Sequence, residues 1–125
     1  MKNSTTPLPA PPFVTAGPWI VLSGQVGVDA DWQPVTGGIQ DEMHAAFANV
    51  RTHLAAAGAT MSDIVKVTCY LADLSFFPDY NQVWSEVFRT QPPARTTFQV
   101  GLYPPFRVEL DVTAYRESPS TPVEG

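Results

Sequence analysis

The feature that most restricts the fold of this chain is a change in the period of its apolar residues. Residues 64–71 (Ile-Val-Lys-Val-Thr-Cys-Tyr-Leu) are β-branched and alternate between two faces, which predicts a strand. Residues 39–57 instead carry apolar side chains at spacings of three and four, which predicts a helix with one apolar stripe. A second stripe, from Phe77 to Val87, predicts another helix. Chains that mix these two periods pack helices against a sheet.

Four further segments have the composition of strands. Residues 13–15 and 19–22 predict a hairpin, and residues 94–100 and 107–115 predict two strands around a proline-containing turn. The order β-β-α-β-α-β-β indicates an α+β domain, with two helices on one face of a mainly antiparallel sheet. Because two helices cover only one face, the other face is expected to meet solvent or another subunit.

Length and composition fit one domain with short extensions. The chain has 125 residues, 44% of them hydrophobic and 15% charged, which is typical of a packed core rather than of a disordered chain. Four of its 13 prolines fall at positions 7, 9, 11 and 12 and predict an extended N-terminal segment over residues 1–12. Residues 117–125 are predicted to form a flexible C-terminal tail. The domain is therefore expected over residues 13–116.

Charge and cysteine content argue against several partners. The chain carries 7 Lys and Arg against 12 Asp and Glu, a net charge of −5, and its cations are spread along the sequence. Nucleic acids and anionic membranes require clustered cations, so neither partner is expected. No segment approaches the roughly 20 apolar residues of a membrane span. The single cysteine, Cys69, cannot form an internal disulfide and no signal peptide is visible, so the expected location is the cytoplasm.

The residue pattern gives little support for metal or thiol chemistry. His44 and His53 fall on opposite sides of one predicted helix, so they cannot bind one ion together. Cys69 lies on the apolar face of its strand, which indicates a buried structural thiol. Phe47 and Trp84 fall on the helical stripes and are assigned to the core. Neither a metal site nor a cofactor is expected.

Arg95 and Glu109 are the strongest candidates for site chemistry. Arg95 follows Pro92-Pro93-Ala94 and offers a planar guanidinium suited to a carboxylate, although an exposed arginine paired with an acid fits the pattern equally well. Glu109 is either a solvated strand residue or a general base that faces a cleft. If the apolar residues of the last two strands pack on the helices, Arg95 and Glu109 share the uncovered face. Spacing alone does not decide between these alternatives.

Several segments together resemble a known family. They are Ser23-Gly24-Gln25-Val26, Gly37-Gly38-Ile39, Ala55-Ala56-Ala57-Gly58, Asp63-Ile64-Val65-Lys66-Val67-Thr68, Leu71-Ala72-Asp73-Leu74, Tyr80-Asn81-Gln82-Val83-Trp84, Pro93-Ala94-Arg95-Thr96 and Val108-Glu109-Leu110-Asp111-Val112. This series, over residues 13–115, resembles the RidA/YjgF family of small imine deaminases. The resemblance implies a chorismate-mutase-like α+β fold. It also implies a homotrimer whose sheets form a central barrel, with a ligand cleft at each subunit interface.

The same resemblance implies a reaction and roles for particular residues. The expected activity is hydrolysis of reactive 2-imino acids or enamines to 2-oxo acids and ammonia, without a cofactor. Arg95 is expected to bind the carboxylate of this small substrate, and Glu109 to position the water. Ser23, Gly24 and Asn81 match positions that line or support the cleft. Thr97 replaces the family's cysteine and can still hydrogen-bond a ligand.

Departures from the family pattern leave other functions open. Leu8-Pro9-Ala10 stands where active members carry a tyrosine that closes over the ligand, and the loop between Arg95 and Glu109 is one residue shorter. One alternative is a non-catalytic trimer that binds small carboxylates, and another is a pathway-specific enzyme for a larger substrate. Ribonuclease or translation-inhibitor activity, described for some members, is disfavoured by the net charge of −5.

Overall fold

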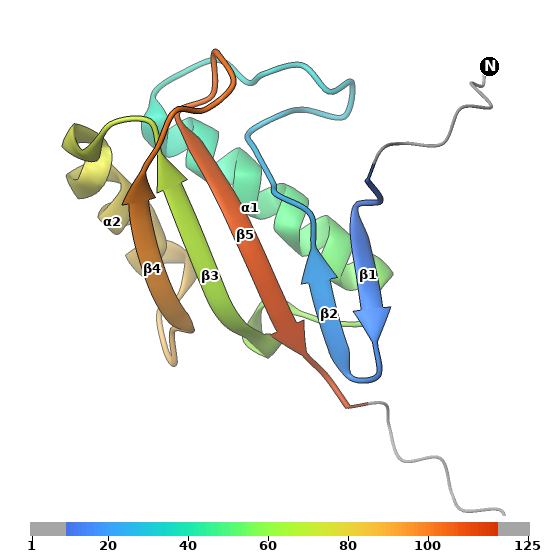
Figure 1. Cartoon of the computed structure of the whole chain (residues 1–125). Coiled ribbons are helices and arrows are strands. Elements are labelled where there is room, and N and C mark those ends of the chain that lie inside the picture. The colour runs from blue at the N-terminus through green and yellow to red at the C-terminus, as the bar shows by residue number, and fades with distance from the viewer. Residues whose placement is uncertain (1–9, 118–125) are drawn as a thin grey trace, which may run out of the picture.

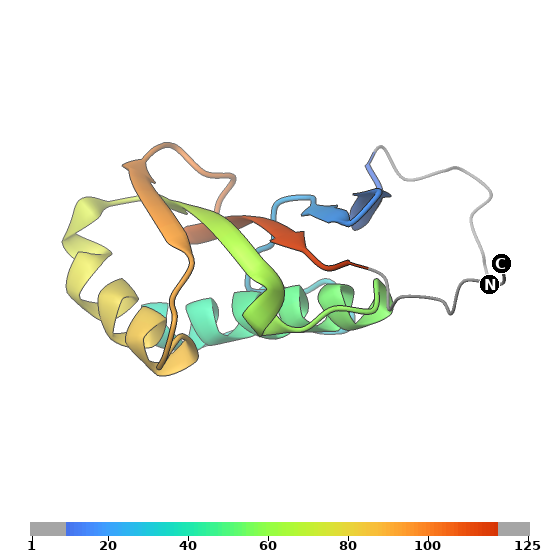
Figure 2. The ribbon, with the colours of Figure 1, turned by 90° about the horizontal axis from the view of Figure 1, so that it is seen from below.

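Two helices cover one face of a five-stranded sheet in the computed structural model, which describes residues 10–117 (Figures 1 and 2). Residues 1–9 of the predicted extended segment (residues 1–12) and residues 118–125 of the predicted tail (residues 117–125) lie outside the described residues. The elements are β1 (Phe13–Ala16), β2 (Trp19–Leu22), α1 (Ile39–Ala56), β3 (Ile64–Leu71), α2 (Phe77–Val87), β4 (Ala94–Gln99) and β5 (Val108–Tyr115). Short 3-10 turns at Met61–Asp63 and Leu74–Phe76 precede β3 and α2. The α+β class predicted from the sequence is confirmed.

The sheet has the strand order β1-β2-β5-β3-β4. All neighbouring pairs are antiparallel except β3 and β4, which are parallel, so the prediction of a mainly antiparallel sheet is confirmed. The strands β4 and β5 follow each other along the chain, yet β3 lies between them. The helix α2 makes the crossover from β3 to β4 that a parallel pair requires. No helix in the described part of the chain is both long and apolar enough to cross a membrane.

The helix α1 forms where its stripe can be buried. Met43, Phe47 and Leu54 are almost fully buried against the sheet. At the start of the helix, the Asp41 carboxylate accepts a hydrogen bond from the Gly38 N–H at 3.0 Å, which satisfies a backbone donor. The helix ends at Ala56, and Gly58, two residues beyond, has a φ of +83° in the left-handed region that glycine tolerates without steric cost.

Alternation along β3 and β5 separates a buried face from an open face. Side chains facing the helices are fully buried: Val67, Cys69, Leu71, Val108, Leu110, Val112 and Ala114. Glu109 and Asp111 point to the other side, which no helix covers (Figure 2). This open face also carries exposed apolar residues from β1, β2 and β4, among them Val14, Val21 and Phe98.

The prediction that Arg95 shares the open face with Glu109 is wrong. In the parallel β3–β4 pair, Arg95 lies beside the inward-facing Val67, so its side chain is on the helix side of the sheet. The pattern misleads because β4 is an edge strand, and its helix-facing positions meet the flank of α2 rather than the closed core. Phe98, an apolar residue of the same strand, does not pack on the helices but is 51% exposed on the open face.

Candidate functional site

Arg95 lies in an aromatic cradle built by one helix. Its guanidinium carbon is 4.9 Å from the ring centres of both Tyr80 and Trp84, and 5.7 Å from that of Phe77. Nη1 donates a hydrogen bond to Oδ1 of Asn81 at 2.9 Å. All four partners belong to α2, so one helix fixes the plane of the guanidinium.

No carboxylate in residues 10–117 forms an ion pair with Arg95. The alternative of an exposed strand arginine paired with an acid is therefore not what the described residues show. The half-buried guanidinium of Arg95 is held by three aromatic rings and the Asn81 amide, so some of its N–H groups remain able to donate to another acceptor. Two parallel N–H groups of a fixed, planar guanidinium match the two oxygens of a carboxylate.

The Tyr80 side chain, which contacts Arg95, also contacts Thr97 and Cys69. The Thr97 hydroxyl hydrogen-bonds the Tyr80 hydroxyl, so its polar atom is engaged inside the protein. Burial raises the pKa of the Cys69 thiol to about 11, although hydrogen bonding to Tyr80 opposes this shift. The prediction that Cys69 is a buried thiol is confirmed, and its raised pKa argues against a nucleophile. A ligand contact by Thr97 stays a prediction.

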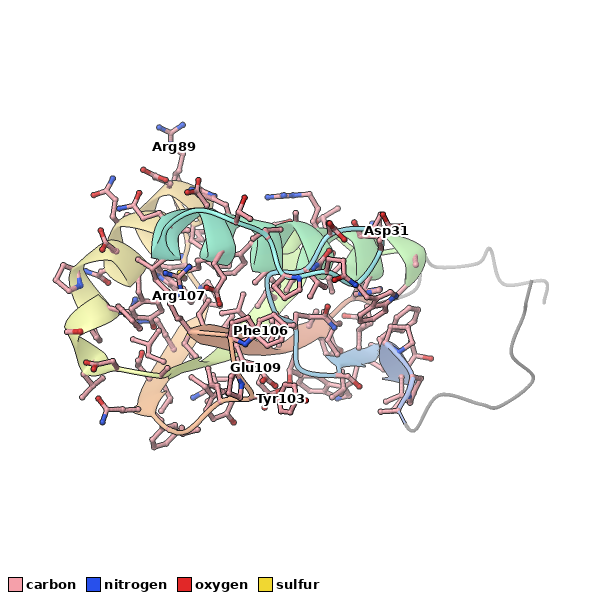
Figure 3. All side chains as sticks on the ribbon, turned by 90° about the horizontal axis from the view of Figure 1, so that it is seen from above. Asp31, Arg89, Tyr103, Phe106, Arg107 and Glu109 are labelled. Carbon is pink, nitrogen blue, oxygen red and sulfur yellow. The ribbon has the colours of Figure 1, made fainter. Side chains whose placement is uncertain are left out.

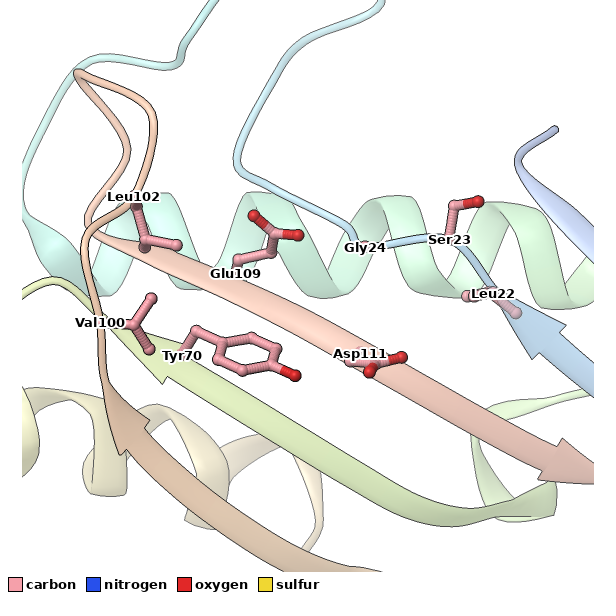
Figure 4. Close-up of a pocket in the computed structure, with 8 residues that line it drawn as sticks. All are labelled: Leu22, Ser23, Gly24, Tyr70, Val100, Leu102, Glu109 and Asp111. Carbon is pink, nitrogen blue, oxygen red and sulfur yellow. The ribbon is translucent and has the colours of Figure 1, made fainter. Parts of the chain in front are cut away.

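Glu109 lies in an open hollow on the uncovered face, on the side of the sheet away from the helices (Figures 3 and 4). The hollow has a volume of about 480 Å³. Its lining comes from β2 and the residues after it, from β3, from the loop after β4 and from β5: Leu22, Ser23, Gly24, Tyr70, Val100, Leu102, Glu109 and Asp111. The structure thus brings together Ser23, Gly24 and Glu109, three of the positions selected from the sequence.

The pKa of Glu109 is raised above its usual value. Partial burial is the larger cause, because it disfavours the charged carboxylate, and the negative charge of Asp111 adds to it. Asp111 is two residues along β5 and therefore on the same face. A carboxylate with a raised pKa is a stronger proton acceptor, which is the property a general base needs.

The backbone at Gly24 packs directly against the Glu109 carboxylate. A Cβ added at Gly24 would overlap Oε2 of Glu109, so any side chain at this position requires the Glu109 carboxylate to move. Two backbone hydrogen bonds hold this segment on β5, since Gln25 and Leu110 exchange N–H···O contacts of 2.8 and 2.9 Å. The Ser23 hydroxyl is turned away and donates to the carbonyl of Pro11 at 2.6 Å.

The six predicted site residues fall into two groups on opposite sides of the sheet. Arg95, Asn81 and Thr97 lie on the helix side of β4, whereas Ser23, Gly24 and Glu109 line the hollow on the open face. Arg95 does not line that hollow. Within one chain, therefore, the guanidinium and the carboxylate do not face a common cavity.

Sequence reasoning missed a buried carboxylate at Glu42. Its side chain is 5% exposed and accepts a hydrogen bond from Nε of Arg107 at 2.7 Å. It also accepts backbone N–H bonds from Arg107 at 2.7 Å and from Val108 at 3.2 Å. Residue 42 is three positions after Ile39 and four before Ala46, so it falls on the buried stripe of α1. An acid on an apolar stripe is the signal that could have found it.

Residues 10–117 contain no group of three or more His, Cys, Asp or Glu side chains that could hold a metal ion. His44 instead contacts the carboxylate of Glu86 through Nε2 at 2.9 Å.

Comparisons with known proteins agree with this architecture. A sequence model of the family described as endoribonuclease L-PSP matches residues 6–116. The 2-iminobutanoate/2-iminopropanoate deaminase of Dermatophagoides farinae is 39% identical over 116 residues, covering 89% of this chain and 91% of that protein. The crystal structure of yeast Mmf1 superposes with a TM-score of 0.85 at 30% identity, over 90% of each chain. RidA from an Antarctic Psychrobacter gives a TM-score of 0.78 at 30% identity, over 83% of this chain and 85% of that one. The chain therefore belongs to the endoribonuclease L-PSP family, also known as the RidA/YjgF family.

Proposed function

We propose that this protein hydrolyses reactive 2-imino acids, and enamines that tautomerise to them, to 2-oxo acids and ammonia. The observation that carries the proposal is Arg95, a guanidinium fixed by three rings and Asn81 that has no acidic partner among the described residues. Such a group is suited to the carboxylate that every 2-imino acid carries. Relatives named 2-iminobutanoate/2-iminopropanoate deaminase support the same reaction.

The proposed site forms between two copies of the chain, as part of a homotrimer. Arg95 and Glu109 lie on opposite sides of one sheet, so a substrate that meets both needs Arg95 from one copy and Glu109 from the next. The exposed apolar residues of the open face, such as Val14 and Phe98, favour its burial against other copies. Light scattering tests this step, and a monomer at working concentration would contradict it.

Glu109 acts as the base in the proposed mechanism. Arg95 binds the carboxylate and holds the imine carbon over the hollow, so that water is aligned for attack. Water adds to the carbon of the protonated imine while Glu109 accepts a proton, which gives a carbinolamine. Glu109 returns this proton to the nitrogen. The carbon–nitrogen bond then breaks and ammonia leaves with the electron pair, and the hydroxyl gives its proton to the departing ammonia, which yields the carbonyl of the 2-oxo acid and ammonium.

The chemistry proposed for the described residues requires no cofactor, because a protonated imine is already electrophilic. We also infer a small substrate rather than RNA, since a net charge of −5 with scattered cations does not favour a polyanion. A cytoplasmic location is consistent with a single cysteine that is buried and free.

Hydrolysis of imines made in place by an amino-acid oxidase tests the proposal. Semicarbazide traps the imine that remains, so a deaminase lowers the yield of semicarbazone. Arg95→Ala removes charge-assisted hydrogen bonds of about 1.5–3 kcal/mol each, which predicts a loss of at least roughly a hundredfold in kcat/KM. Arg89→Ala, a change at an exposed arginine just after α2, is the matched control and should retain activity. An active Arg95→Ala protein would refute the proposed role.

Mixing two inactive variants tests whether the site is shared. Arg95→Ala lacks the carboxylate-binding group and Glu109→Gln lacks the base. After subunit exchange, a mixed oligomer contains some interfaces where an intact Arg95 meets an intact Glu109, so part of the activity should return. Activity that stays absent in verified mixed oligomers would show that both groups must come from the same chain. Binding of 2-oxo acids without any imine turnover would instead support a non-catalytic carboxylate-binding trimer.

A further inference from the structure

We infer that the preferred ligand is a 2-imino acid with a bulky apolar side chain, branched or aromatic, and that Tyr70, Val100 and Leu102 select it. This inference rests on the proposed function and deepens it by naming the substrate class. It follows from the lining of the hollow around Glu109, which is apolar at one end and acidic at the other (Figure 4).

The apolar end of the hollow is formed by Val100, Leu102 and the ring of Tyr70. Figure 4 shows Val100 and Leu102 at one end of the hollow and Asp111 further along β5 at the other. The Tyr70 ring lies between them, below Glu109, with its hydroxyl toward Asp111. Tyr70 is directly opposite Glu109 in the β3–β5 register, so the ring borders the reacting group. Tyr70 also stacks on Phe98, with ring centres 6.3 Å apart and planes at 20°, which extends the aromatic surface.

The size of the hollow fits a larger substrate than the smallest imino acids. Its volume of about 480 Å³ is within the range of roughly 300–1,000 Å³ typical of small-molecule sites. A one-carbon side chain would leave the wall formed by Val100 and Leu102 in contact with water. A branched or aromatic side chain would cover this wall, and the burial of its apolar surface would favour binding.

The negative charge of the hollow disfavours substrates with an acidic side chain. The carboxylates in the lining belong to Glu109 and Asp111, and among residues 10–117 no basic side chain of the same chain lines the hollow. An acidic substrate side chain would meet like charge at short range, which disfavours it. The protonated imine carries positive charge and is favoured in the same place.

The apolar wall is anchored at both ends. The Val100 N–H donates to the carbonyl of Leu71 at 3.0 Å, and the Arg107 carbonyl accepts from the Ala72 N–H at 2.9 Å. At the Arg107 end, the backbone N–H and the side-chain Nε of Arg107 both donate hydrogen bonds to the Glu42 carboxylate. Because the loop between residues 100 and 107 is fixed in this way, Leu102 keeps its place in the lining.

Relative rates on imines of different size test the inference. Imines made from phenylalanine or leucine should have a kcat/KM at least about tenfold above that of the imine made from alanine, the low end of what apolar pocket contacts discriminate. Leu102→Ser should lower this ratio severalfold. Leu74→Ala, which removes a leucine that is 50% exposed and does not line the hollow, should leave the ratio unchanged.

Calorimetry of the products separates this inference from the proposed function. Phenylpyruvate and 4-methyl-2-oxopentanoate should bind more tightly than pyruvate, and Leu102→Ser should reduce the difference. Tighter binding of the bulky acids without imine turnover would support the pocket and refute the deaminase. Turnover that is equal for all sizes, or fastest for the alanine-derived imine, would overturn the inference and leave the deaminase standing. Neither turnover nor selective binding would overturn both.

Discussion

Replacing Glu42 by glutamine perturbs the contact that ties α1 to the start of β5. The carboxylate is 5% exposed and accepts from three donors: Nε of Arg107 on one oxygen, and the backbone N–H groups of Arg107 and Val108 on the other. Glutamine has nearly the same shape, but only one of its two polar atoms accepts a hydrogen bond. If the amide oxygen keeps the two backbone donors, the amide NH₂ faces the guanidinium of Arg107.

The expected loss follows from this geometry. Glu42→Gln removes one charge-assisted hydrogen bond and sets a donor against a donor, which predicts a loss of about 1.5–3 kcal/mol in the free energy of unfolding. In urea, where small proteins lose about 1–3 kcal/mol per molar of denaturant, the unfolding midpoint should fall by roughly 1 M. This is a large part of the stability of a small domain, which is about 5–15 kcal/mol.

Urea unfolding followed by tryptophan fluorescence measures the effect. Wild type and variants must be compared at one protein concentration, because formation of the proposed trimer would make the unfolding midpoint depend on concentration. Glu86→Gln is the matched control, since Glu86 also contacts a basic side chain, that of His44, but at an exposed position on α2. It should leave the midpoint close to that of the wild type. If Glu42→Gln unfolds at the wild-type midpoint, the reasoning about this buried carboxylate is refuted.

Three further predictions concern the hollow and the thiol. Gly24→Ala should abolish imine turnover while circular dichroism stays native, because the new methyl group displaces the Glu109 carboxylate; retained turnover would contradict this contact. The acidic limb of the kcat/KM profile should lie above the ordinary glutamate range, because the pKa of Glu109 is raised, and Asp111→Asn should move the limb to lower pH; an unmoved limb would exclude Asp111 as a cause. Because the pKa of Glu109 is raised in the folded protein, the protonated side chain contributes to folding stability at low pH. This contribution to stability is lost as the pH rises through the pKa of Glu109 in the folded state. Cys69, with a pKa of about 11, should resist iodoacetamide in the native protein and react in urea, whereas rapid native labelling would show an accessible thiolate.

Periodicity was sufficient to predict the elements whose buried face is central to the fold. The stripe of α1 and the alternation in β3 correspond to side chains that are fully buried, such as Met43 and Val67. Their spacing reflects contact with the core, which is a local property that the sequence displays.

The face on which Arg95 lies could not be predicted in the same way. Alternation divides a strand into two sets of residues, and it does not say which set meets the helices. In β4 both sets are mixed, because an edge strand has no fully buried side: Phe98 is half exposed, while Thr97 reaches Tyr80. The assignment depends on the parallel pairing with β3, which is set by the crossover through α2 and not by β4 itself.

The lining of the hollow was also beyond sequence reasoning. Tyr70 lies on β3 and Leu102 in the loop after β4, and only the strand order brings them together. Ser23 and Gly24 were found because they lie in a motif of the family, and Glu109 was a candidate from both its strand pattern and its motif. Residues that shape the hollow without belonging to a motif gave no such signal.

The placement of Arg95 and Glu109 on opposite sides of one sheet has a consequence for how the protein can diversify. Arg95, the side chain proposed to bind the carboxylate, and the residues that hold it come from one continuous stretch, α2 to β4, and pack on the helix side. Residues such as Leu102 and Val100 can change on the opposite side without disturbing the aromatic cradle of Arg95. In the proposed site, the residues that would recognise the part common to all substrates and those that would recognise the part that varies therefore belong to different sides of the sheet. Directed evolution of new side-chain preferences should therefore succeed through open-face libraries that leave α2 untouched.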